Sequence, residues 1–305
     1  MAINLISWNF HGFRAHSAEF KTLIHKYQPI CIYIQETYLS PNIDPRIANY
    51  SFLRKDNINN SRAAGGVVAI VYSNLFPSKP VCINTPLQAA AIQIHIKMPI
   101  AICTIYLPPH QIISLNELDN LIVQLPTPFI LLGDLNGHST LWGSDATNNR
   151  GLQIEKLISD NSLCLLNDSS YTHFHQPSRT FHTIDLAICT PSIFTRWNFS
   201  TEDDLYKSDH FPILLTHSDN SITFPKRPAR FIFDKANWPL FTVISELTVD
   251  MAQSHDIDTA VENITNHILA AADIEIPKTS GKQPRLWKPW WDEKYAEAFR
   301  NQKRC

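Results

Sequence analysis

Short apolar runs separated by turn residues recur through the first 216 residues, and they restrict the possible folds most strongly. The run at 129–132, FILL, has the length and composition of a strand covered on both faces. Between these runs, apolar residues at helical spacing predict helices at 17–27, 115–125 and 151–161. In the last of these, Leu152, Leu157 and Ile158 are expected to line one face. The pattern predicts an α/β protein of largely antiparallel sheets with helices outside. The other predicted strands are 2–9, 30–35, 65–72, 90–96, 100–106, 163–167, 182–189, 197–201 and 211–216.

A change of character near residue 220 predicts a domain boundary. The stretch SDNSITFPKRPARFIF combines turn residues, two prolines and a basic cluster. Beyond it, residues 256–274 predict a helix with Val261, Ile264, Ile268, Leu269 and Ala272 on one face. We therefore expect one domain at 1–220 and a helical connector at 221–305. The charged final stretch has no capping signal, which is typical of a fragment of something longer.

The charge balance excludes a strongly basic nucleic-acid-binding protein. Residues 1–220 carry 14 Lys and Arg against 17 Asp and Glu, net −3, and the remainder carries 12 against 11, net +1. A domain of this charge that handles phosphates needs a bound cation or a locally basic face.

Cysteine spacing and hydropathy indicate the compartment. The six cysteines are scattered without C-x-x-C or zinc spacing, which predicts reduced thiols and a nuclear or cytoplasmic protein. Neither a signal peptide nor a membrane-spanning run is expected, so the protein should be neither secreted nor membrane-bound.

Polar side chains close the predicted strands more often than turn formation requires. A lone Asp or Asn at a strand end is usually a turn former, and a lone His beside an apolar run is usually a core residue. Seven such cases at one kind of position favour a single site over independent turns. They are Asn9, Glu36, Asp134, Asn136, Asp185, Asp209 and His210, with Tyr106 closing a further strand.

Metal-assisted phosphoester cleavage is the chemistry that this set suits. Glu36 is a hard oxygen ligand for Mg²⁺, which takes one or two protein carboxylates and keeps most of its waters. His210 beside Asp209 suggests an imidazole oriented by an acid, although Asp185 is an alternative partner. Asp134 is a candidate to hold the attacking water.

Six short motifs occur in the order seen in the endonuclease/exonuclease/phosphatase superfamily. They are WN at 8–9, QET at 35–37, YLPP at 106–109, GDLN at 133–136, ID at 184–185 and SDH at 208–210. The longer strings GDLNGHSTLWGS, NNRG and SDHFPI resemble the endonuclease domain at the start of jockey-type non-LTR retrotransposon polymerases. FDKANW at 233–238 and PWW at 289–291 resemble the connector to the reverse transcriptase, which is expected after residue 305.

The resemblance implies a fold and a division of roles. The fold would be a DNase I-like four-layer α/β sandwich of two packed, mixed, mainly antiparallel sheets with outer helices. Mg²⁺, with Mn²⁺ as a substitute, would be bound by Glu36 with help from Asn9. Asp134 and Asn136 would position the water and the phosphate, and Tyr106 would support the phosphate. Asp209 would orient His210, which would contact the phosphate or act as the base. Asp185 would complete the hydrogen-bond set. Whether Asp134 or His210 is the base stays open.

The implied activity is Mg²⁺-dependent nicking of double-stranded DNA, which leaves a 3′-hydroxyl that primes reverse transcription. Element RNA is a further implied partner, through the region beyond residue 305. Two alternatives remain: a phosphomonoesterase or phospholipase on the same scaffold, and an inactive truncated copy of an element.

Residues around the motifs bear on target choice and packing. His182 replaces a serine that the family often has three residues before the Asp185 position, and Ser139 replaces a second histidine. His173, His175 and His182 alternate like metal ligands, but we favour an exposed hairpin without a metal as their explanation.

Trp8 and Trp142 are expected to pack in the core. The candidate DNA contacts are Arg14, Arg62, Arg179 and His182.

Overall fold

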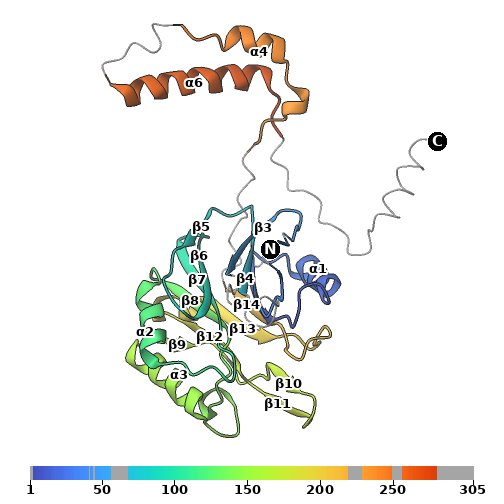
Figure 1. Ribbon diagram of the computed structural model, residues 1–305, viewed down its shortest axis with the longest axis vertical. Coiled ribbons are helices and arrows are strands. Elements are labelled where there is room, and N and C mark those ends of the chain that lie inside the picture. The colour runs from blue at the N-terminus through green and yellow to red at the C-terminus, as the bar shows by residue number, and fades with distance from the viewer. Residues whose placement is uncertain are drawn as a thin grey trace, which may run out of the picture. The chain divides into compact units, whose positions relative to one another are not determined.

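The computed structural model describes residues 3–40, 42–43, 45–55, 68–218, 229–248 and 256–279. Contacts group these residues into two units, 3–218 and 229–279. The first unit contains two six-stranded sheets, and each sheet contains one parallel pair of strands among antiparallel neighbours. The predicted mixed, mainly antiparallel architecture is therefore confirmed (Figure 1).

The first sheet has the strand order β13-β14-β1-β2-β4-β3. Its strands are β1 (Asn4–Asn9), β2 (Cys31–Gln35), β3 (Tyr50–Lys55), β4 (Val68–Ser73), β13 (Trp197–Thr201) and β14 (Ile213–His217). Helix α1 (Ser17–Tyr27) links the parallel strands β1 and β2 and buries Phe20, Leu23 and Ile24 against this sheet. Fully burying side chains of this kind stabilises the fold by about 1.5–3 kcal/mol each.

The second sheet has the order β5-β6-β7-β8-β12-β9. Its strands are β5 (Ser78–Val81), β6 (Gln88–His95), β7 (Pro99–Tyr106), β8 (Phe129–Asp134), β9 (Cys164–Leu165) and β12 (Asp185–Cys189). Helix α2 (Leu115–Gln124) begins at a capping box formed by Ser114 and Glu117, and α3 (Asn149–Asp160) begins at Asn148. These two helices cover the outer face of the second sheet.

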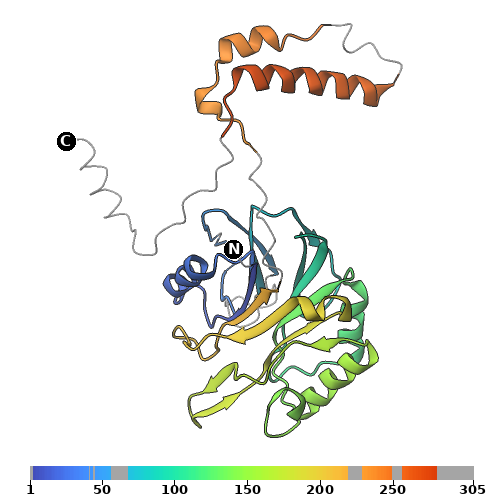
Figure 2. The same cartoon turned by 180° about the vertical axis from the view of Figure 1, so that it is seen from behind.

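The two sheets pack face to face over an apolar core that takes side chains from both. Separate apolar clusters lie between each sheet and its outer helices. Two packed sheets with helices on both outer faces form the four layers that the resemblance implied. A small hairpin of β10 (His173–His175) and β11 (Thr180–His182) extends from one end of this sandwich (Figure 2).

Two predicted strands are shorter than expected. The run 163–167 forms only the two-residue edge strand β9, because β9 pairs with just Ile188 and Cys189 of β12. The run 182–189 is interrupted, because the backbone N–H groups of Ile184 and Asp185 donate to the Thr172 hydroxyl instead of a ladder partner. The sequence patterns did not predict β3, β5 or α4 (Trp238–Ile244).

The predicted buried face of α3 is wrong at Leu152, which is 54% exposed. Leu157 is buried as predicted and Ile158 packs half-buried against the same cluster, together with buried Gly151 and Ile154. A Cβ on Gly151 would lie 1.8 Å from the backbone oxygen of His138. The close approach at this glycine rotates the helix so that Leu152 points outward.

The second unit pairs α4 with α6 (Ile257–Glu275). Of the predicted apolar face of α6, Ala272 is buried and Ile264 is half-buried, whereas Val261, Ile268 and Leu269 are exposed. The short helix α4 packs on α6. The PWW segment and Arg62 lie outside the described residues.

The thiols and the hydropathy match the sequence-based expectations. The five described cysteines are free. No helix in the described part of the chain is long and apolar enough to cross a membrane.

Candidate active site

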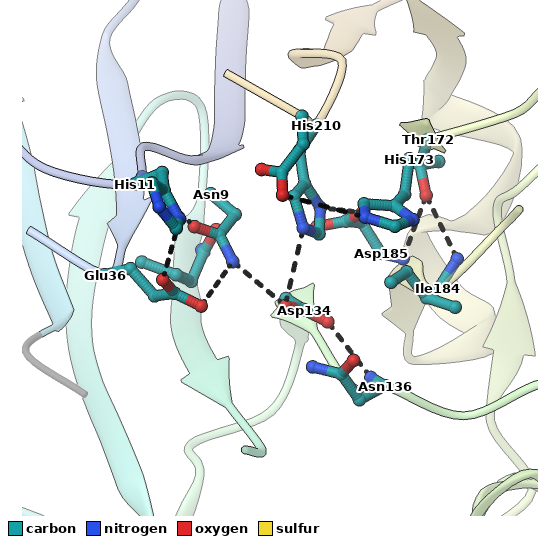
Figure 3. Close-up of polar contacts among 12 residues, drawn as sticks. Asn9, His11, Glu36, Asp134, Asn136, Thr172, His173, Ile184, Asp185 and His210 are labelled. Atoms are coloured by element: carbon teal, nitrogen blue, oxygen red, sulfur yellow. Dashed lines mark hydrogen bonds and ion pairs between the residues drawn. The ribbon is translucent and has the colours of Figure 1, made fainter. Parts of the chain in front are cut away.

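The ends of two parallel strand pairs meet at one edge of the sandwich. Asn9 lies beside Gln35 at the ends of β1 and β2, and Tyr106 lies beside Asp134 at the ends of β7 and β8. Parallel strands place their carboxyl ends at the same edge, and face-to-face packing brings the two edges together. The amide of Asn9 spans the gap, since its Nδ2 donates to Asp134 Oδ2 at 3.0 Å and to Glu36 Oε1 at 3.1 Å (Figure 3).

Asn9 therefore contacts both acids through its N–H groups. Its oxygen instead accepts the backbone N–H of His11 at 3.3 Å. In this orientation Asn9 positions the two carboxylates, and its implied part in holding a metal stays a prediction.

Glu36 follows β2 in the left-handed backbone region, with φ at +49°. Burial opposes its ionisation, but hydrogen bonds from Tyr38, Tyr106 and Asn9 lower the pKa of this carboxyl below its ordinary value. His11 Nδ1 lies 3.4 Å from Glu36 Oε2, and the Glu36 side chain is 12% exposed. Glu36 thus stays ionised within reach of solvent, as a ligand for a hard cation must.

Asp134 is the last residue of β8 and is 1% exposed. The preceding Gly133 has φ at +150°, and a Cβ there would lie 1.9 Å from the backbone oxygen of Ile105 in β7. Only glycine therefore fits immediately before this acid. Burial and the nearby Asp185 carboxylate raise the pKa of Asp134, while His210 and Asn9 offset part of that rise.

His210 is held by Asp185, which lies directly across the antiparallel ladder from Asp134. His210 Nδ1 is 2.8 Å from Asp185 Oδ2, and its Nε2 is 3.9 Å from Asp134 Oδ2. Burial alone would lower the pKa of His210, but Asp185 and Asp134 raise it to about 10. The imidazole is therefore a cation at neutral pH.

Asp209 does not make the contact with His210 that was expected of it. Its Oδ2 lies 3.8 Å from Nε2 of His173, a residue of β10. Burial opposes ionisation of Asp209, but His173 and His210 hold its pKa below the usual range. Asp185, the alternative that remained open from the sequence, is the acid that hydrogen-bonds His210.

Tyr106 and Asn136 border the same edge. Burial and the Glu36 carboxylate raise the pKa of Tyr106, so its phenol keeps its proton as a donor. Asn136 donates its backbone N–H to Asp134 Oδ1 at 3.0 Å and its side-chain Nδ2 to the Leu107 carbonyl at 3.2 Å. Both residues lie with Asp134, as expected.

Several contacts were not predicted from the sequence. Arg150 of α3 donates to the carbonyls of Leu107, Leu135, Pro108 and Gln111, and so braces the loops after β7 and β8. Its only sequence signal is the NNRG string. Tyr38, Thr172 and His173 follow no periodic pattern, because each reaches the site from an irregular loop or short strand.

The described residues among the candidate DNA contacts divide into two groups. Arg14 and Arg179 are exposed, and Arg179 lies at the tip of the β10–β11 hairpin with φ at +54°. His182 instead lies against His138, with ring centroids 5.1 Å apart. Burial and neighbouring imidazoles lower the pKa of both His138 and His182.

The tryptophans pack in the core as predicted. Trp8 and Trp142 are 1% and 0% exposed. Trp8 Nε1 also donates to the His210 carbonyl at 2.9 Å, which helps to hold the loop carrying that histidine.

Comparisons with known proteins agree with this fold. A family described as endonuclease-reverse transcriptase matches residues 100–214. The endonuclease domain of TRAS1, a telomere-specific non-LTR retrotransposon, has a TM-score of 0.60 at 19% identity and covers 71% of this chain and 98% of that domain. An AP endonuclease from Archaeoglobus fulgidus has a TM-score of 0.55 at 15% identity, and the match covers 71% of this chain and 100% of that one.

Curated relatives extend across most of the chain. The probable RNA-directed DNA polymerase from transposon X-element of Drosophila melanogaster is 24% identical over 291 residues, which is 93% of this chain and 32% of the relative. The RNA-directed DNA polymerase from mobile element jockey of the same species is 24% identical over 280 residues, 89% of this chain and 30% of the relative. The chain thus spans about a third of the length of these relatives.

The resemblance inferred from the sequence motifs is confirmed by the family match, the relatives and the fold together. Residues 100–214 match the endonuclease-reverse transcriptase family, the first unit has the fold of the TRAS1 endonuclease domain, and the chain is similar to the polymerases of the X-element and jockey transposons.

Proposed function

We propose that residues 3–218 form a Mg²⁺-dependent endonuclease that nicks one strand of double-stranded DNA and leaves a 3′-hydroxyl. One observation carries the proposal: Asp134 and Asp185 lie against a single imidazolium, His210, at one edge of the sandwich, and Asn9 links Asp134 to a third carboxylate, Glu36. This arrangement holds more negative than positive charge, which suits a divalent cation and a phosphate together.

The residues present fit a hard cation. Glu36 is ionised and reachable from solvent, and the pKa of Asp134 is raised by burial beside a second acid, which indicates uncompensated negative charge. Carboxylate oxygens are the ligands that Mg²⁺ prefers. Glu36 is the carboxylate that would hold the ion, which when bound would neutralise charge on the phosphate and the leaving oxygen.

Asp134 and His210 take different roles in the proposed mechanism. His210 is already protonated through its bond to Asp185, so it donates from Nε2 to a phosphate oxygen and does not act as base. Asp134 is the carboxylate that accepts a proton from the attacking water, because its raised pKa places it close to the working pH. In this proposal the base is therefore Asp134.

The surrounding residues orient the substrate. Tyr106 keeps its phenolic proton and donates to the phosphate, and Asn136 positions the phosphate beside Asp134. Asp209 acts only indirectly, because it faces His173 at the rim of the site. Arg14 and Arg179 are exposed cations for contact with flanking phosphates, as the sequence suggested.

The relatives indicate the wider context of the proposal. In a full-length protein like the X-element and jockey polymerases, the 3′-hydroxyl would prime reverse transcription, and element RNA would be bound outside this chain. Residues 221–305 would then be the connector to that region, and the protein would act in the nucleus or cytoplasm.

A plasmid assay tests the proposal directly. Supercoiled DNA incubated with the protein and Mg²⁺ should convert to the nicked form, and a chelator or Asp134→Asn should abolish the conversion. A DNA polymerase should then extend the nick without phosphatase treatment, because the product carries a 3′-hydroxyl. Release of inorganic phosphate from small monoesters without nicking would instead support the phosphomonoesterase alternative.

A further inference from the structure

The β10–β11 hairpin has two chemically distinct faces. Side chains two apart on a strand share a face, and cross-strand partners face the same way. Because His173 pairs with His182 and His175 pairs with Thr180, the histidines share one face. Phe174 pairs with Phe181 on the other face.

His138 joins the histidine face from the loop that follows β8. Its ring centroid lies 5.1 Å from that of His182, and His182 lies 6.1 Å from His173. Three imidazoles from two separate segments therefore crowd together beside the catalytic edge. An exposed hairpin without a metal, the explanation favoured from the sequence, does not account for the approach of His138.

Two of the three rings have one nitrogen beside a hydroxyl or a carboxylate. A metal-binding histidine uses one nitrogen for the ion and holds the other with a carboxylate or hydroxyl. His182 Nε2 lies 2.8 Å from the Thr180 hydroxyl, and His173 Nε2 lies 3.8 Å from Asp209 Oδ2. His173 Nδ1 is buried and finds no hydrogen-bond partner among the described residues.

We propose that His138, His173 and His182 bind a transition-metal ion such as Zn²⁺, and that the ion fastens the hairpin to the loop after β8. Zinc prefers imidazole nitrogen at about 2.0–2.1 Å, whereas Mg²⁺ prefers oxygen, so this site is chemically separate from the carboxylate centre. As the rings stand, their ligand atoms do not all lie within 4.8 Å of one another, so the rings must turn toward a common point to bind an ion. His175 stays outside the ligand set because its ring centroid lies 6.4 Å from that of His182, farther than the 5.1 Å of His138.

One alternative ligand set involves the catalytic edge. Single ligand atoms of His173, Asp209 and His210 lie within 4.8 Å of one another. An ion bound there would not need His138 or His182, so substitutions at these two positions separate the two arrangements.

Zinc affinity measured by competition with a chromophoric chelator, in saturating Mg²⁺, tests the proposal. The wild-type chain should bind one Zn²⁺, and Co²⁺ in its place should give the intense visible absorption of a tetrahedral site. His138→Asn and His182→Asn should each weaken binding by on the order of 100-fold, at least the loss seen when an outer-shell partner is removed. His95→Asn, an exposed histidine on β6, is the matched control and should bind normally.

Two results would overturn the proposal: zinc affinity unchanged in the His138→Asn, His182→Asn double variant, or zinc binding lost in Glu36→Gln. Circular dichroism and thermal melting without metal should show each variant folded as wild type. Because the readout is metal affinity, its outcome is independent of whether the protein nicks DNA.

Discussion

The two parallel strand pairs of the sandwich end in acids of opposite character. β1 and β2, linked by α1, lead to Glu36, which lies one residue past the ladder in the left-handed region and remains partly exposed. β7 and β8, linked by α2, end with Asp134 inside the ladder at 1% exposure. The pKa of Glu36 is lowered by three hydrogen-bond donors, whereas the pKa of Asp134 is raised by burial and Asp185.

The difference shows how one edge supports two roles. An acid displaced beyond its strand meets solvent and phenol donors and stays charged, which suits a cation ligand. An acid kept within its strand is desolvated beside a second carboxylate and approaches protonation, which suits a base. Similar local topology therefore yields different chemistry because burial differs.

The largest effect is expected from Asp134→Asn. Removing the base should lower the nicking rate about 10³-fold or more, within the range for general acid–base groups and their supporting charges. Metal-free stability should be unchanged or higher, because a buried carboxylate next to Asp185 is removed. Single-turnover nicking and thermal melting measure the two quantities.

Asp160→Asn, at the exposed end of α3, is the matched control and should behave as wild type. A folded Asp134→Asn variant that retains full activity would refute the assignment of the base.

Glu36→Gln should act through metal affinity. We expect about 10²-fold lower activity at limiting Mg²⁺, because an amide is a weaker ligand than a carboxylate. Raising Mg²⁺ should restore part of the rate in Glu36→Gln but none in Asp134→Asn. Nicking rates across a Mg²⁺ titration would show this, and equal rescue of both variants would remove the proposed distinction between the acids.

The charge of His210 should appear in its titration. In chelator-treated protein, its imidazole signals in NMR should stay protonated at pH 8, because its pKa is raised to about 10 by Asp185 and Asp134. His138 and His182, whose pKa values are lowered by burial, should titrate below about 6.5.

The raised pKa of His210 also makes the stability of the fold depend on pH. A raised folded-state pKa means that the stabilisation from His210⁺ is fully present below about pH 6.5 and is lost as the pH rises toward 10. Thermal midpoints should therefore fall over this range less steeply in His210→Gln than in wild type. An equally steep fall of the thermal midpoint with pH in His210→Gln and in wild type would contradict a charged His210.

The smallest effect is expected from Arg150→Met, which removes the brace shared by the loops after β7 and β8. Loss of charged hydrogen bonds to partly buried carbonyls should cost about 1–3 kcal/mol in the free energy of unfolding. Activity should fall by about 10-fold or less, since no reacting group is removed. Denaturant unfolding and nicking rates check this, with Arg196→Met as the exposed control.

Much of the local structure follows from sequence pattern. The spacing of α1 places Phe20, Leu23 and Ile24 on its buried face, and the run 129–132 forms a buried strand that ends at an acid. Leu152 was wrongly placed on the buried face of α3 because Gly151, with no side chain to count as apolar, is the residue in closest contact. The strands β3 and β5 carry no clear alternation, so only their pairing reveals them.

For the active site, too, some features follow from the sequence and others only from the tertiary structure. Residue types and their positions at strand ends, read from the sequence alone, predicted one polar set of Asn9, Glu36, Tyr106, Asp134, Asn136, Asp185, Asp209 and His210. Only the tertiary structure decided that Asp185 and not Asp209 holds His210, that Asn9 bridges two acids, and that His138 meets the hairpin. Those contacts join segments far apart in the chain, and the pKa of each acid depends on burial that arises only when the two sheets pack.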